Sequence, residues 1–114
     1  MTQGLEEEWE KVRAEVFKRD KGRCQCCAAL SMKEMLWYKK TKRKPDDHLE
    51  CAHHIPRSYK DTYCDPNNLA MLCPEHHFRI DHYYDPVTGK QMSHEQREAW
   101  WKRILKDKYT YFQF

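Results

Sequence analysis

The sequence predicts a small α+β fold in which helices flank two short strands, all within one domain spanning residues 1–114. Three observations predict it. Apolar residues recur at helical spacing near both ends of the chain. Between them, His48–Ile55 and Leu69–Cys73 are strand-like, and each runs directly into a proline. Finally, the chain is only 39% hydrophobic but holds six cysteines and seven histidines, so we expect a small core that needs a covalent or metal crosslink.

The first helix is predicted over about residues 5–20. Its apolar residues recur at spacings of four, three and four from Leu5 to Val16, which places them on one face. Three glutamates lie at its start and three basic residues near its end, as the helix dipole favours. Gly22 is suited to end it.

A second helix is predicted to begin after Ser31, because Ser31 and Glu34 form a capping-box pattern. Residues 39–47 show no apolar pattern, and we expect an exposed loop there.

The second half of the chain predicts a turn, a strand and two helices. Asp65–Asn68 is typical of a turn before the strand at Leu69. Pro74 suits the first turn of a helix that continues to about His82. Ser93 and Gln96 again form a cap, here for a final helix.

Composition excludes several classes of protein. No run of about 18 apolar residues occurs, which excludes a membrane span. The start of the chain lacks the basic and apolar regions of a signal peptide. We therefore expect a cytoplasmic protein with reduced thiols, in which clustered cysteines are metal ligands.

The charge is unevenly distributed. The formal net charge is +3, but residues 11–44 contain twelve Lys and Arg against three Asp and Glu. Basic residues are densest at Lys39, Lys40, Lys42, Arg43 and Lys44. This run is either a solvated loop or a surface that faces phosphates, and the charge count does not decide between them.

Two residue pairs have the spacing of zinc ligands. Cys24 and Cys27 form one pair, and Cys73 and His76 form the other. Each pair supplies half of a tetrahedral site, so together they predict a closed, structural Zn²⁺. Cys26 offers an alternative first pair with Cys24, but a two-residue spacer is the usual one in zinc knuckles.

A second group of residues has the character of a catalytic site. His53 and His54 are adjacent at the end of a strand, so they should point to opposite sides and do different jobs. His77 and Asp81 lie one helical turn apart and share a face. With Asn68, they are candidates for holding a cation beside a histidine base.

These residues form an ordered series of motifs. The segments are Arg19–Cys27, Ala52–Ile55, Asn68-Leu69 and Leu72–His77. The series resembles the HNH endonuclease family with its ββα-metal motif, and is similar in particular to small phage-type members that carry zinc. His76 stands where many such members have a cysteine, and Cys₃His remains a sound zinc set.

The resemblance implies a two-stranded antiparallel hairpin packed on a helix around a catalytic Mg²⁺, Mn²⁺ or other divalent ion. It implies that His53 and His77 bind this ion, with Asp81 as a third ligand. His54 would be the general base, and Asn68 would brace the loop that orients it.

The resemblance also implies hydrolysis of DNA, as nicks or as double-strand breaks, by a monomer or weak dimer in the cytoplasm of a phage-infected or prophage-bearing bacterium. DNA would contact the basic run from Lys39 to Lys44 and Arg57, and phage terminase subunits are candidate partners. Two alternatives remain open at this point: a non-catalytic, zinc-stabilised nucleic-acid-binding module, and an accessory protein of phage packaging.

Overall fold

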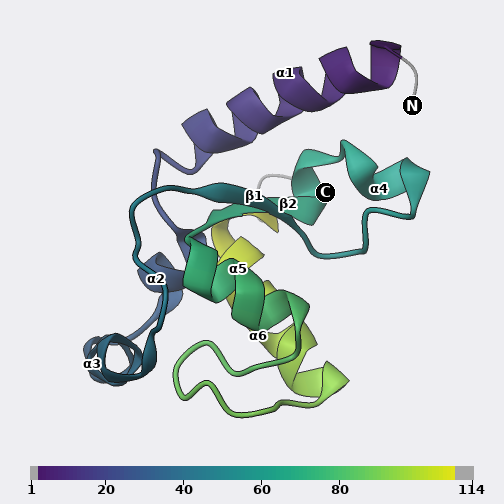
Figure 1. Ribbon diagram of the computed structural model, residues 1–114. Coiled ribbons are helices and arrows are strands. Elements are labelled where there is room, and N and C mark those ends of the chain that lie inside the picture. Colours follow the sequence, from purple (N-terminus) through teal and green to yellow (C-terminus); the bar gives the residue numbers. More distant parts are fainter. Residues whose placement is uncertain (1–2, 110–114) are drawn as a thin grey trace.

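A small mixed α+β fold is present in the computed structural model, which describes residues 3–109 (Figure 1). Its two strands form one antiparallel sheet, and helices surround it. In chain order the elements are α1 (Gln3–Arg19), α2 (Gln25–Ala29), α3 (Met32–Thr41), β1 (Glu50–His53), α4 (Lys60–Tyr63), the 3₁₀ helix η1 (Pro66–Asn68), β2 (Leu69–Leu72), α5 (Pro74–Asp81) and α6 (His94–Tyr109).

The hairpin lies between two helical layers. β1 and β2 pair antiparallel, with Glu50 opposite Leu72 and His53 opposite Leu69. All four residues of β2 are buried, because α1 covers one face of the hairpin and α5 and α6 lie on the other (Figure 1). Alternate side chains therefore enter different clusters: Leu69 and Met71 pack with α1, whereas Ala70 and Leu72 join the main core.

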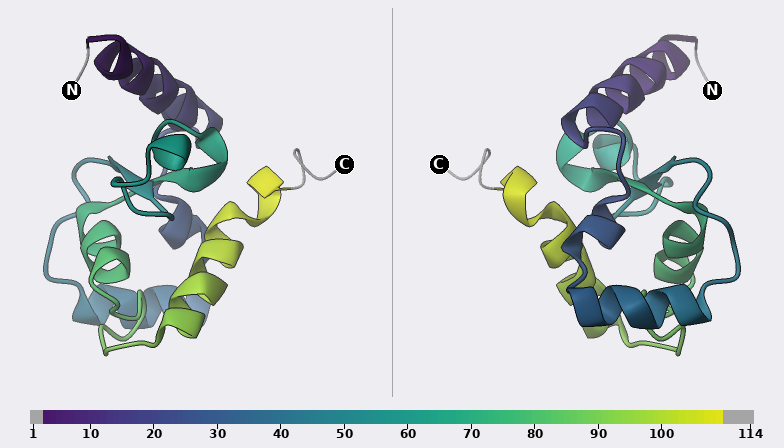
Figure 2. Two further views of the ribbon diagram at one scale, coloured as in Figure 1. Left: turned by 90° about the vertical axis from the view of Figure 1, so that its right-hand side faces the viewer. Right: turned by 90° about the vertical axis from the view of Figure 1, so that its left-hand side faces the viewer.

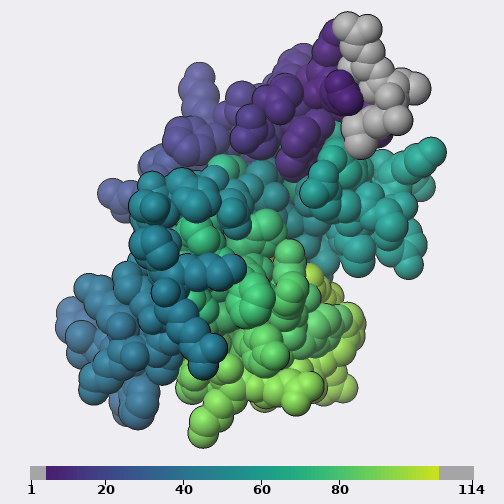
Figure 3. Space-filling view, viewed as in Figure 1, coloured from purple at the N-terminus to yellow at the C-terminus, as the bar shows by residue number. Residues whose placement is uncertain are grey.

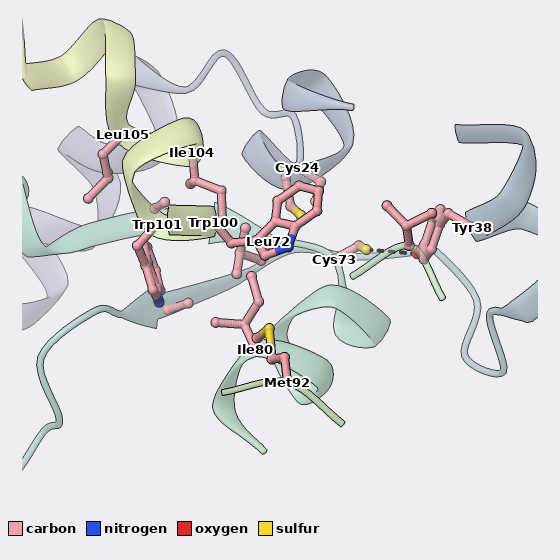
Figure 4. Close-up of a cluster of buried hydrophobic side chains, with 14 residues drawn as sticks. Cys24, Tyr38, Leu72, Cys73, Ile80, Met92, Trp100, Trp101, Ile104 and Leu105 are labelled. Carbon is pink, nitrogen blue, oxygen red and sulfur yellow. Dashed lines mark hydrogen bonds between the residues drawn. The ribbon is translucent and has the colours of Figure 1, made fainter. Parts of the chain in front are cut away.

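The main core forms around α6. Trp101, Ile104 and Leu105 are almost fully buried, and they pack with Leu72 and Ile80 from β2 and α5 (Figure 4). Burial of several large side chains is the principal source of stability in so polar a chain. It fixes α6 against the hairpin, which matters for the site described below.

The end of α1 is anchored to the hairpin by a buried carboxylate. Asp20 is 2% exposed, and it accepts hydrogen bonds from the Met71 N–H at 2.9 Å and from Arg19 Nε at 2.8 Å. Arg19 also donates to the carbonyls of Pro66 and Leu69. The N-terminal end of α1 extends away from the rest of the molecule (Figure 2).

Both predicted helix caps are confirmed. Ser31 and Glu34 form a reciprocal capping box at the start of α3. Ser93 and Gln96 exchange the same pair of hydrogen bonds at the start of α6. Among residues 3–109, no helix combines the length and apolar character needed to cross a membrane.

The structure differs from the sequence prediction in three places. The 39–47 loop begins later than expected, because α3 continues to Thr41 and includes Lys39 and Lys40. The short helices α2 and α4 were not predicted. Helices of four or five residues have too few turns to produce an apolar period, so local hydrogen bonds decide them.

Candidate metal centre and histidine cleft

Four side chains from distant parts of the chain meet as predicted for a zinc site. They are Cys24, Cys27, Cys73 and His76, whose potential ligand atoms all lie within 4.8 Å of one another. Cys24 caps α2, and Cys73 and His76 come from the first turn of α5. Pairing of β2 with β1 and packing against α2 place the two halves together. The predicted Cys₃His group is therefore present, and it could hold a zinc ion.

The spacing of the ligand atoms fits zinc. His76 Nδ1 lies 3.5, 3.4 and 3.5 Å from the sulfurs of Cys24, Cys27 and Cys73. In a tetrahedral site with Zn–S of about 2.3 Å and Zn–N of about 2.0 Å, the sulfur-to-nitrogen distance is about 3.5 Å. The side chains thus already stand at the separation that a bound Zn²⁺ requires.

A second layer of contacts orients the ligands. His76 Nε2 lies 3.2 Å from the Pro86 carbonyl, so it is the protonated nitrogen and Nδ1 is left for a metal. The Tyr38 ring stacks on His76 at 3.9 Å, and its hydroxyl lies 3.2 Å from Cys73 Sγ (Figure 4). These contacts fix the His76 tautomer and restrict the Cys73 rotamer.

Clustering of the thiols favours a thiolate at Cys24. Hydrogen bonds from the thiols of Cys27 and Cys73 lower the pKa of Cys24 well below its ordinary value despite its burial. A preformed thiolate is the species that binds a metal, and the remaining thiol protons are released on binding.

Cys26 does not belong to the group. It is fully buried in the core, and burial raises the pKa of its thiol well above the ordinary value. Cys27, in contrast, faces His76 and donates its backbone N–H to Cys24 Sγ at 3.4 Å. The structure therefore resolves the first pair as Cys24 and Cys27.

The second predicted group lies in a cleft of about 790 Å³ on another part of the molecule. The cleft is bordered by the end of β1, the loop after it, the end of α5 and the start of α6. Its lining includes the candidate metal ligands, the candidate base and one candidate DNA-binding residue, namely His53, His77, Asp81, His54 and Arg57.

His53 points toward α1. Its ring stacks on Trp9 with centroids 5.1 Å apart, and its Nε2 lies 2.9 Å from the Tyr63 carbonyl. Since that carbonyl can only accept, Nε2 carries the proton and Nδ1 has a free lone pair. Burial lowers the pKa of His53, which favours the neutral imidazole that metals bind.

His54 points the opposite way, toward α6. Its ring stacks on Trp101 with centroids 5.2 Å apart, and its Nε2 lies 2.8 Å from both carboxylate oxygens of Glu98. The two adjacent histidines thus face opposite sides, as strand geometry predicts.

Asn68 fixes the chain next to His54. Its carbonyl accepts the His54 N–H at 2.9 Å, and its side-chain Oδ1 accepts the Ile55 N–H at 2.6 Å. Its Nδ2 donates to the carbonyls of Ile55 and Thr62. Asn68 is buried and does not line the cleft. Its hydrogen bonds therefore hold the backbone of His54 and Ile55 in place and do not face the cleft.

His77 lies between two carboxylates. Its Nδ1 is 2.8 Å from Glu50, and its Nε2 is 3.1 Å from Asp81. Burial opposes the charged imidazole, but these hydrogen bonds outweigh it and raise the pKa of His77. Asp81 lines the cleft and Glu50 does not, so Nε2 is the nitrogen on the cleft side.

His53, His77 and Asp81 share the cleft without converging on one point. Within residues 3–109, the Cys₃His group is the one set whose ligand atoms all approach within 4.8 Å. Nδ1 of His53, Nε2 of His77 and the Asp81 carboxylate are nevertheless donors that a divalent cation accepts. The predicted three-ligand catalytic set stays a prediction.

The basic run lies beside α5 and outside the cleft. Figure 3 shows the 40–48 segment bordering the surface of α5. Lys44 Nζ lies 4.3 Å from the ring centroid of Phe78, the residue after His77, whereas Lys42 is paired with Asp46 at 2.8 Å. Arg57 lies at the cleft and donates to the Tyr63 hydroxyl at 2.8 Å.

Three residues of these sites were not predicted from the sequence: Glu50, Glu98 and Tyr38. Glu98 is 44 positions from His54, on a helix whose acidic residues otherwise look solvated. No local spacing marks such a pair. Glu50, three residues before His53 on β1, could have been noticed as a carboxylate on the strand that carries the histidines.

Comparison of the chain with family models, with curated proteins and with solved structures finds no match to any of them.

Proposed function

We propose that this protein is a metal-dependent endonuclease of the HNH type that hydrolyses DNA phosphodiester bonds. The observation that carries the proposal is the cleft, which four histidines line, and one of them, His54, follows a strand end braced by Asn68. A hairpin continued directly by α5 supports a ββα-metal core. The Cys₃His group, which includes two residues at the start of α5, supports a zinc-bearing member of the family.

In this proposal His53 and His77 hold the catalytic ion, with Asp81 beside them. The bound cation would supply electrostatic stabilisation of the phosphorane and of the departing oxygen. The donor set fits Mg²⁺, Mn²⁺ and other divalent ions, because imidazole and carboxylate ligands accept all of them. Glu50 would orient His77 from its other nitrogen.

His54 is the general base. It takes a proton from water, so that an O–H bond breaks and an N–H bond forms, and the hydroxide oxygen attacks phosphorus. The bond from phosphorus to the 3′ oxygen then breaks, the 3′ oxygen takes a proton from solvent water, and His54 returns its own proton to solvent, so one water molecule is consumed and the base is regenerated. The products are a 5′ phosphate and a 3′ hydroxyl. One base serves one strand, so each domain makes a nick.

DNA would be held by its phosphates. Arg57 lines the cleft, and Lys44 lies over Phe78 on α5, outside the cleft. Contacts of this kind position the backbone and carry little sequence information. They also make affinity fall with salt, which gives a simple assay for the DNA-facing surface.

A supercoiled-plasmid assay tests the proposal. Chelated protein is compared with Mg²⁺-supplemented and Mn²⁺-supplemented protein, beside His54→Ala. We expect metal-dependent nicking, with the cleavage rate of His54→Ala lower by roughly 10² to 10⁴ while DNA binding is retained. His82→Ala, which removes an exposed histidine outside the cleft lining, is the matched control.

Two results would contradict the proposal. If His54→Ala cleaves like the wild type, His54 is not the base. If folded, zinc-bound protein binds DNA but cleaves with no divalent ion, the alternative of a non-catalytic nucleic-acid-binding module is correct.

A further inference from the structure

We infer that Glu98 is a positioning residue that fixes the tautomer of His54, and that Nδ1 of His54 is the atom that accepts the proton from water. The inference rests on the proposed function for its catalytic consequence, whereas the tautomer can be measured without any cleavage.

The contact between the two side chains is close and symmetric. His54 Nε2 lies 2.8 Å from both Oε1 and Oε2 of Glu98. An ionised carboxylate only accepts hydrogen bonds, so Nε2 must carry the proton. In a neutral imidazole the lone pair is then on Nδ1, which has no hydrogen-bond partner among residues 3–109.

Helix α6 holds His54 at three points. Arg97, the residue before Glu98, donates to the His54 carbonyl at 3.3 Å. Trp101, three residues after Glu98, stacks on the His54 ring and is fully buried. Residues three apart share a helix face, and the core packing of Trp101 fixes that face against the strand end. Glu98 is therefore presented to Nε2 by a rigid element.

This arrangement has two chemical consequences. In the neutral imidazole, a carboxylate on the far nitrogen holds the proton there, so the lone pair lies on the near nitrogen, which can act as a base. It also stabilises the imidazolium that forms when the base takes its proton, as a buried carboxylate does for the histidine of a Ser-His-Asp triad. Both effects favour the transition state and neither involves DNA binding.

Glu98→Gln tests the inference, because it removes the charge and keeps the shape. Its amide can donate as well as accept, so the preference for the Nε2–H tautomer is lost. Glu95→Gln is the matched control: it removes an equal charge from the exposed first turn of α6. Glu98→Asp keeps the charge on a side chain shorter by one methylene, and we expect an intermediate result.

Two readouts separate the possible failures. Long-range ¹H–¹⁵N imidazole spectra, assigned with His54→Ala, report the tautomer directly. We expect Nε2–H in the wild type and Glu95→Gln, and a mixture in Glu98→Gln. In the plasmid assay we expect Glu98→Gln to lower kcat by about 10- to 100-fold with the KM for DNA unchanged.

Several results would overturn the inference. An Nδ1–H tautomer in the wild type, or an unchanged tautomer in Glu98→Gln, contradicts it whether or not the protein cleaves DNA. If Glu98→Gln shows the expected mixture of tautomers but cleaves DNA with the kcat of the wild type, Glu98 has no role in catalysis. If the wild type has the Nε2–H tautomer but cleaves with no ion, the proposed function fails and the positioning of His54 stands.

Discussion

The six cysteines illustrate how differently one residue type can be used in a small protein. Cys24, Cys27 and Cys73 surround His76 Nδ1 at zinc-binding spacing. Cys26 is a core side chain with no exposure at all. Cys51 is half-buried, and burial raises the pKa of its thiol to about 12, which makes it unreactive.

We expect Cys73→Ser to lose zinc and the folded state together. Cys73 lies between β2 and α5 and is one of the four candidate ligands. Without its thiol, three ligands remain, which do not complete a closed tetrahedral zinc site. Zinc content and far-ultraviolet circular dichroism measure the two losses. Cys51→Ser, which removes a thiol outside the ligand group, is the control. A folded, zinc-free Cys73→Ser protein would show that the site does not stabilise the fold.

A second residue-scale prediction contrasts two adjacent asparagines. Asn68→Ala removes three side-chain hydrogen bonds, from the Ile55 N–H and to the carbonyls of Ile55 and Thr62, so we expect a loss of about 1–3 kcal/mol in the free energy of unfolding. Asn67 Oδ1 is buried with no hydrogen-bond partner among the described residues, so Asn67→Ala should cost less. Urea unfolding of both variants measures the difference, and equal losses would contradict the bracing role.

At the scale of elements, the layers are joined by a few charged side chains as well as by apolar packing. Asp20 ties the end of α1 to β2. Arg103 on α6 joins α3 through Glu34 at 2.8 Å and α2 through the Ala29 carbonyl at 2.6 Å. Since α2 and its N-cap carry two of the candidate zinc ligands and α6 carries Glu98, these links connect the Cys₃His group to the cleft.

The link between Glu34 and Arg103 predicts a dependence of stability on pH. The Arg103 hydrogen bond lowers the pKa of Glu34 to about 2 from its ordinary 4.5. A lowered carboxyl pKa stabilises the fold fully above the unfolded-state value, and this contribution is lost as the pH falls toward the folded-state value. We expect Glu34→Gln to cost about 0.5–1 kcal/mol at neutral pH, as for other solvent-accessible pairs.

The measurement is the difference in unfolding free energy between wild type and Glu34→Gln across pH. The difference should be constant above about pH 5.5 and should narrow as the pH falls through 4.5 toward 2. Taking the difference cancels the pH dependence of zinc binding, because both proteins have the same ligands. A difference that already narrows well above pH 4.5 would contradict the assigned link.

At the scale of the whole molecule, the charges are separated more than the net charge of +3 suggests. In the loop that follows α3, Lys44 lies against α5, with its Nζ 4.3 Å from the ring centroid of Phe78, and this loop borders α5 (Figure 3). The opposite end of the molecule carries α1, whose exposed N-terminal half is acidic (Figure 2).

We expect the basic run to set the salt dependence of DNA binding. Changing Lys39, Lys40, Arg43 and Lys44 to glutamine should reduce the slope of log Kobs against log salt by up to about 0.9 for each phosphate that is no longer neutralised. Lys42 is left unchanged because Asp46 already pairs with it.

The matched control changes four basic residues on and just after α1 to glutamine: Lys11, Arg13, Lys18 and Lys21. It removes the same charge from another part of the surface. Fluorescence anisotropy over a salt series measures both slopes. If the two variants have equal slopes of log Kobs against log salt, the basic residues 39–44 form a solvated surface that does not contact DNA.

The sequence alone predicted the two strands, the helices of eight or more residues and the four side chains of the Cys₃His group, since these depend on local spacing. Ser31 with Glu34 predicted a cap that the structure contains. Two pairs at metal-ligand spacing predicted the Cys₃His group. The sequence also predicted that His53 and His54 face apart, because alternation along a strand needs no knowledge of its neighbours.

Only the tertiary structure decided what those side chains meet. Packing of α6 on the hairpin brings Glu98 to His54, and packing of α1 brings Trp9 to His53. It also decided between Cys26 and Cys27, because burial and not spacing separates them. Contacts between residues 44 positions apart depend on how helices pack across a sheet, and no local pattern encodes that distance.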